Sequence, residues 1–173
     1  MKLELPYRNH LSEKEITELN KIKIKQRYKK NQIHCKGNGN LIKPKGFWYS
    51  YKNEWFNICK KESYRKNKYV YKVNINKNQF TTIDKPNKNK ILLLNSVKDY
   101  KKFEKIQKKL NNNLKFKKYI INNFTGLDIS PNLFYSKYFK NEYFIFYGWD
   151  LPSGVIWDLR IIDIKINKIQ KGL

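Results

Sequence analysis

The chain has 173 residues, enough for a domain with a buried core, and its 38 basic against 14 acidic residues give a net charge of +24. With 40% apolar and 16% aromatic residues it is not expected to be intrinsically disordered. The first ten residues hold no apolar signal segment and the longest aliphatic run, Ile91–Leu94, is too short to cross a bilayer, so we expect a soluble intracellular protein without a membrane partner, not a secreted one.

The N-terminal part carries a helix-start signal. Ser12 stands at an N-cap position, Glu15 at the third position after it, and Leu11 and Ile16 can pack across the turn. This pattern predicts a helix over residues 13–20. We therefore divide the chain into an N-terminal helical and basic segment, residues 1–30, and a single domain, residues 31–173.

Strand patterns follow a cluster of turn residues at 37–40. Phe47–Tyr51 holds four aromatics in five residues, and Tyr69–Ile75 places its larger side chains on alternate positions. Residues 80–83 are interpreted as the hairpin partner or bulged continuation of that second strand, and Ile91–Leu94 as a further short strand. Residues 55–59 are expected to begin a short helix beside the first strand.

Helical patterns dominate the middle of the chain. Ser96 is a second N-cap, and Val97, Tyr100, Phe103, Ile106 and Leu110 recur at helical spacing. A third helix is predicted from Phe116 to Phe124, with Gly126 as its stop, and these aromatic residues are interpreted as core. Strands are expected again at 143–147 and 155–157. The mixed order predicts an α+β fold: a small, split, mixed or antiparallel sheet with flanking helices.

Two short motifs resemble strands of the ADP-ribosyltransferase fold, the family of poly-ADP-ribose polymerases and diphtheria-type toxins. The first is Gly46-Phe47-Trp48-Tyr49-Ser50. The resemblance implies that Gly46, Trp48, Tyr49 and Ser50 bind NAD, with Trp48, or alternatively Tyr49, stacking on the nicotinamide ring. Upstream, His34 falls in a segment similar to the family's first strand, where a histidine binds a ribose hydroxyl.

The second motif is Ser153-Gly154-Val155-Ile156-Trp157-Asp158, which continues to residues 161–165 and is similar to the family's closing strand. Ser153 stands where the family has its catalytic Glu, and it lacks the charge that stabilises the oxocarbenium-like state when the nicotinamide bond breaks. Asp150 or Glu142 could supply a carboxylate from a nearby loop. Residues 148–157 also resemble a segment in proteins of large DNA viruses with A/T-rich genomes.

The charge predicts a polyanionic partner. Alanine is absent, while residues with A/T-rich codons are abundant; acidic residues share that codon bias and are nevertheless few. Lysines contact phosphates without reading base edges, so binding to DNA or RNA would be non-specific and salt-dependent. The alternative is a solvated lysine surface that binds no nucleic acid.

Three functions are consistent with these observations. The first is an ADP-ribosyltransferase-like NAD-binding protein acting on nucleic acid or another acidic acceptor, with its transfer activity either retained or lost. The second is a basic, non-enzymatic protein that binds or packages nucleic acid, for example in a virion. The third is a structural or interaction protein. Two cysteines and two histidines at no recognised zinc spacing predict free thiols and no metal site.

Overall fold

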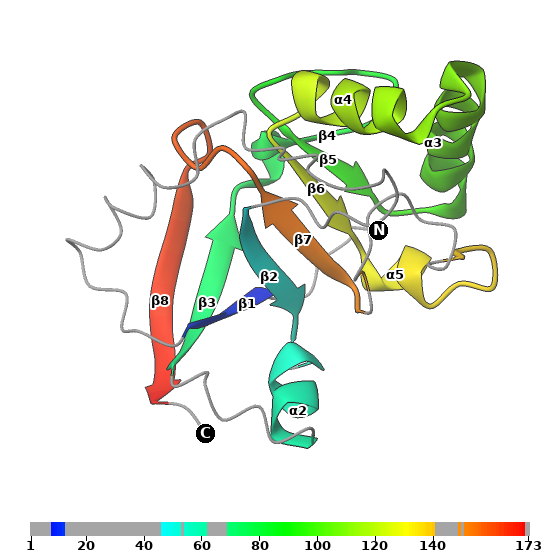
Figure 1. The fold of residues 1–173 in the computed structure, drawn as a ribbon. Helices are drawn as coiled ribbons and strands as arrows, with labels where there is room; N and C mark the ends of the chain where they lie inside the picture. The colour runs from blue at the N-terminus through cyan, green and yellow to red at the C-terminus, as the bar shows by residue number, and fades with distance from the viewer. Residues whose placement is uncertain are drawn as a thin grey trace.

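The computed structural model describes residues 8–12, 46–52, 54–61, 69–140, 149 and 151–171. Within this part of the chain, eight strands form one mixed sheet in the order β4-β5-β6-β7-β2-β1-β3-β8, with helices packed against it (Figure 1). The α+β class is confirmed. The strands are β1 (Arg8–Ser12), β2 (Phe47–Tyr51), β3 (Tyr69–Ile75), β4 (Phe80–Thr81), β5 (Ile91–Leu94), β6 (Gly126–Ile129), β7 (Ser153–Ile156) and β8 (Ile164–Lys171). The helices are α2 (Glu54–Lys61), α3 (Val97–Leu110), α4 (Asn113–Asn123) and α5 (Pro131–Phe134), with a 3₁₀ turn at Lys77–Gln79.

The sheet changes character along its width. β4, β5 and β6 run parallel, whereas every pairing from β6 across to β8 is antiparallel. Parallel neighbours need a crossover connection, and the helical pair α3 and α4 provides it between β5 and β6. The two helices lie on one side of the sheet, as Figure 1 shows.

The N-terminal segment contributes to this sheet. Residues 8–12, assigned from the sequence to a helical and basic segment, instead form β1 and pair with β2 on one side and β3 on the other. The strand ends at Ser12, the residue expected to cap a helix. The helix predicted over residues 13–20 lies outside the described residues.

Most of the locally signalled elements are confirmed. β2, β3, β5, α2 and α3 lie where the patterns placed them. The side chain of Ser96 caps α3 by accepting a hydrogen bond from the backbone N–H of Asp99 at 3.2 Å. Three of the aromatic residues of α3 and α4, Tyr100, Phe103 and Phe116, are buried in the core as predicted from their spacing, and Tyr119 packs half-buried against it.

Residues 80–83 were wrongly assigned as the partner of the preceding strand. The 3₁₀ turn at Lys77–Gln79 follows β3 and leads into β4, which pairs in parallel with β5 at the far edge of the sheet. β3 cannot take β4 as a partner because its two edges already pair with β1 and β8.

Two further boundaries differ from the sequence prediction. α4 ends at Asn123, because Phe124 adopts an extended backbone, and Gly126 opens β6 rather than stopping the helix. The closing segment expected to run on from Trp157 is interrupted by a turn, so β8 begins only at Ile164 and pairs with β3. The strand predicted at 143–147 lies outside the described residues.

The core consists of two clusters. The larger joins α3 and α4 to β5, β6 and β7, with Phe103, Phe116, Ile120 and Leu127 among its fully buried members. The second gathers side chains from β2, β3, β5, β7 and β8, including Phe47, Val73 and Ile156. Successive strand residues point to opposite faces, so β2 and β7 supply side chains to both clusters. Among the described helices, none combines the length and apolarity needed to cross a membrane.

Candidate functional site

The two predicted motifs lie side by side. β2 and β7 are antiparallel neighbours, and their register aligns Trp48 with Val155, Tyr49 with Gly154, and Ser50 with Ser153. Gly46 is buried directly before β2. Segments about a hundred residues apart in the sequence thus form one continuous patch in the middle of the sheet (Figure 1).

Trp48 is half-buried on this patch and contacts a second tryptophan. Its ring centroid lies 4.8 Å from that of Trp149, with the planes tilted by 59°. Trp149 is 2% exposed, and its indole N–H donates a hydrogen bond to the carbonyl of Ser153 at 3.3 Å. Trp149 therefore links Trp48 to the first residue of β7 and restricts the space over part of the Trp48 ring.

Two serines lie opposite each other in the register of the strand pair. Ser50 is 3% and Ser153 is 6% exposed. The Oγ of Ser153 donates to the carbonyl of Leu151 at 2.9 Å, whereas the buried Oγ of Ser50 has no hydrogen-bond partner among the described residues. A buried hydroxyl without a partner is costly, so the Ser50 position favours a ligand or water that offers a polar group.

Tyr49 belongs to the opposite face of the sheet. Its hydroxyl donates to Asp128 Oδ2 at 2.8 Å, and the hydroxyl of Tyr51 donates to Oδ1 of the same carboxylate at 2.5 Å. Asp128 is fully buried. Gly154 lies between them in register with both Tyr49 and Asp128, and its missing side chain lets the tyrosine ring cross β7. The geometry gives Tyr49 a role in holding a buried carboxylate.

Sequence reasoning missed three residues of this region. Asp128 carried a signal, because a lone acid between Leu127 and Ile129 in a short apolar run indicates a buried charge that needs donors. Trp149 and His10 carried none. His10 lies in β1, the strand next to β2, so the structure brings a histidine-bearing strand to this part of the sheet.

Three predicted site residues are not placed. His34, Asp150 and the alternative carboxylate Glu142 lie outside the described residues. The structure therefore brings together Gly46, Trp48, Ser50 and Ser153. That Asp150 or Glu142 places a carboxylate beside them stays a prediction. In the described ranges no three His, Cys, Asp or Glu side chains gather as a metal site would require.

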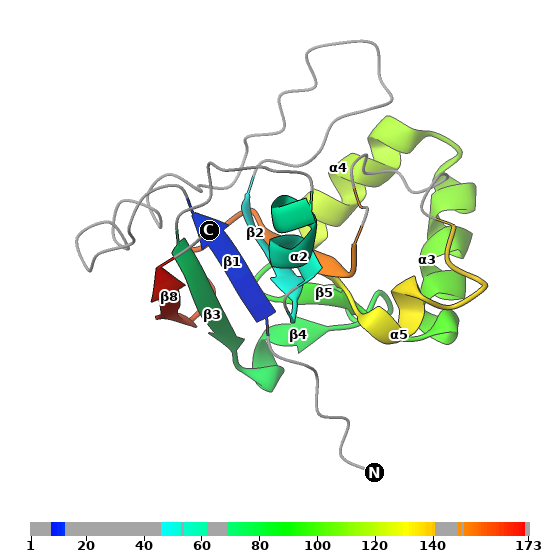
Figure 2. The same ribbon diagram turned by 90° about the horizontal axis from the view of Figure 1, so that it is seen from below.

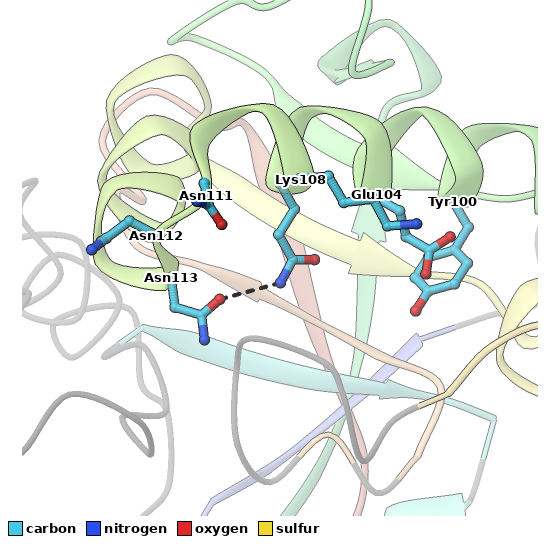
Figure 3. A pocket seen from close by; sticks show the side chains of 7 residues that line it. Tyr100, Glu104, Lys108, Asn111, Asn112 and Asn113 are labelled. Carbon is cyan, nitrogen blue, oxygen red and sulfur yellow. Dashed lines mark hydrogen bonds between the residues drawn. The ribbon is translucent and has the colours of Figure 1, made fainter.

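A hollow of about 460 Å³ lies where α3 meets α4, apart from the patch at β2 and β7 (Figure 3). Gln107 donates to the side-chain oxygen of Asn113 at 3.3 Å within it. Burial, and after it the carboxylate of Glu104, raises the pKa of the Tyr100 hydroxyl, which therefore stays neutral. The hollow is lined mainly by polar side chains. Its lining residues are Tyr100, Glu104, Gln107, Lys108, Asn111, Asn112 and Asn113.

No protein-family model, no curated protein and no solved structure matches the chain. The candidate site therefore depends on its own geometry.

Proposed function

We propose that the chain contains an ADP-ribosyltransferase-like domain that binds NAD beside Trp48 and has lost most or all transfer activity. The observation that carries this proposal is the pairing of β2 with β7, which aligns Ser50 with Ser153 two residues from Trp48. The resemblance of the two motifs requires them to occupy adjacent strands, and the observed pairing of β2 with β7 meets that requirement.

The residues at this patch suit a nicotinamide ring. Trp48 is half-buried, and the π-face of an indole attracts a flat cation such as the pyridinium. The unpartnered Ser50 hydroxyl supplies a hydrogen bond for a carboxamide or a sugar hydroxyl. Both features support binding, and neither requires the missing Glu.

The same patch does not suit group transfer. Ser153 has no charge, and its hydroxyl is already engaged by the carbonyl of Leu151. Removing one preorganised electrostatic group from an active site costs on the order of 100- to 1,000-fold in rate. Asp150, next to Trp149 in the sequence, is the carboxylate that could compensate.

The proposal is tested by titrating the full chain with NAD in a calorimeter and by measuring nicotinamide release. We expect saturable binding with release close to the uncatalysed background. Trp48→Leu removes the aromatic face and should weaken binding at least tenfold. Phe134→Leu is the matched control, because Phe134 is also a half-buried aromatic packed against the same core cluster but lies on α5.

Equal losses in the two variants, or no heat of binding in the unmodified chain, would reject NAD as the ligand. Efficient nicotinamide release would reject only the loss of activity. In that case Asp150→Asn should abolish release if that carboxylate compensates for Ser153.

A further inference from the structure

One face of α3 carries a stripe of lysines. Lysines at positions three and four apart project from the same side of a helix. Opposite the stripe, Tyr100 and Phe103 are buried in the core, so the stripe lies on the solvent face of α3. The stripe consists of Lys98, Lys101, Lys102, Lys105, Lys108 and Lys109.

Almost all of this charge is uncompensated. Lys102 forms an ion pair with Asp84 from the loop before β5. The other five lysines are exposed, and none forms an ion pair with a described residue. α3 itself has two acids, and one of them, Asp99, accepts a hydrogen bond from the capping Ser96. Five like charges held close together on a rigid helix repel one another and attract an extended anion.

An exposed aromatic ring adjoins the stripe. Tyr138 is 50% exposed and belongs to the turn after α5. The segment after α5 lies beside the start of α3 in both views of the fold (Figures 1 and 2). The Nζ of Lys101 lies 5.7 Å from the Tyr138 ring centroid, and the Nζ of Lys137 lies 5.3 Å from it. A ring that lies close to two cations and is open to solvent is a platform on which a nucleobase can stack while its phosphates contact the lysines.

We propose that the α3 lysine stripe and Tyr138 form a binding surface for single-stranded nucleic acid. The lysines contact successive phosphates, and Tyr138 stacks on one base. From Lys98 to Lys109 the stripe is about 16 Å long at 1.5 Å per residue, roughly the axial length of five nucleotides. This surface lies on α3 and the turn after α5, so the inference is independent of NAD binding at β2 and β7.

Two other anions fit the surface less well. An anionic membrane would bind a basic helix that also offers an apolar face to the lipid, but the apolar face of α3 is already buried in the core. A double helix presents phosphates but encloses its bases, so it leaves Tyr138 without a stacking partner. A single strand uses both the charge and the ring.

Binding to nucleic acid is measured by the fluorescence anisotropy of labelled dodecamers of oligothymidylate and oligouridylate and of a labelled duplex of the same length. Binding to membranes is measured by co-sedimentation of the chain with phosphatidylserine vesicles. Lys101→Gln, Lys105→Gln and Lys108→Gln are combined in one variant. The control combines Lys77→Gln, Lys88→Gln and Lys165→Gln, three exposed lysines away from α3 that give the same net charge. Exposed substitutions of this kind rarely change folding, and circular dichroism checks it.

For single strands, we expect the slope of log affinity against log salt to be shallower by about two in the stripe variant. Each lost phosphate contact changes this slope by about 0.7, and the variant removes three lysines. The control should leave that slope unchanged. Tyr138→Leu should weaken single-strand binding by about 5- to 150-fold, which is the contribution of one stacked base, and should leave duplex binding unchanged.

Equal effects of the stripe and control variants would overturn the proposal, because net charge alone would then explain binding. Equal loss of single-strand and duplex affinity in Tyr138→Leu would remove the stacking role and with it the preference for single strands. Vesicle binding that exceeds oligonucleotide binding and disappears in the stripe variant would identify the surface as a membrane contact and reject the nucleic acid.

Discussion

The crossing of the Tyr49 ring over Gly154 makes a sharp stability prediction. A Cβ built on Gly154 would lie 2.3 Å from Cζ of Tyr49 and 2.4 Å from its hydroxyl oxygen. The ring is held there because its hydroxyl donates to the buried carboxylate of Asp128. Gly154→Ala therefore forces the ring to move and breaks that hydrogen bond.

The expected cost follows from two contributions. A hydrogen bond to a charged group contributes about 1.5–3 kcal/mol, and overpacking a well-filled core costs about 1–3 kcal/mol. We expect Gly154→Ala to lower the free energy of unfolding by about 3–5 kcal/mol. For a chain of this length, each kcal/mol lowers Tm by about 2–4 °C, so Tm should fall by about 6–20 °C.

A double-mutant cycle isolates the contact, with unfolding by urea followed by tryptophan fluorescence. In a Tyr49→Leu background the ring is gone, and alanine is favoured over glycine in a strand by about 0.5–1 kcal/mol. Gly154→Ala should then be neutral or slightly stabilising. The coupling free energy between the two positions should exceed about 2 kcal/mol, and additive effects would refute the crossing of the ring over β7.

Three smaller predictions concern the helices and one exposed tyrosine. Ser96→Ala removes the cap of α3 and should cost about 1 kcal/mol in urea unfolding, and Ser96→Asn should restore most of it. Phe103→Ala should cost about 3–5 kcal/mol because that ring is fully buried, and a smaller loss would mean that α3 packs loosely. Burial and a hydrogen bond to Glu54 raise the pKa of Tyr135 to about 12, so the stabilisation it gives is present below pH 10 and lost as pH rises through 12. The ionisation of Tyr135 is measured as the difference between the ultraviolet titration curves of the unmodified chain and of Tyr135→Phe. In Glu54→Gln the pKa of Tyr135 should shift back toward 10.

The candidate site could be predicted from the sequence only in part. The motif around Trp48 and the motif beginning at Ser153 were each recognisable, and their adjacency followed from the resemblance. The face of β2 that holds the site could not be predicted, because alternation shows that neighbouring side chains point to opposite faces without showing which face holds the site. Tyr49 therefore stayed the alternative to Trp48 as the stacking residue, although its hydroxyl donates to Asp128 on the other face.

The sequence by itself determined the elements whose signals are local. Apolar periodicity, residue composition and helix-capping signals predicted the positions of β2, β3, β5, α2 and the start of α3. These signals are local, because residues a few positions apart determine a helix cap or an apolar face. Only the tertiary structure decided which strands pair. β1 lies between β2 and β3, and β4 lies at the far edge of the sheet. Asp128 accepts hydrogen bonds from two tyrosines that are 77 and 79 residues away in the sequence. These choices depend on which partners complete a buried sheet and satisfy a buried charge, and no local pattern carries that information.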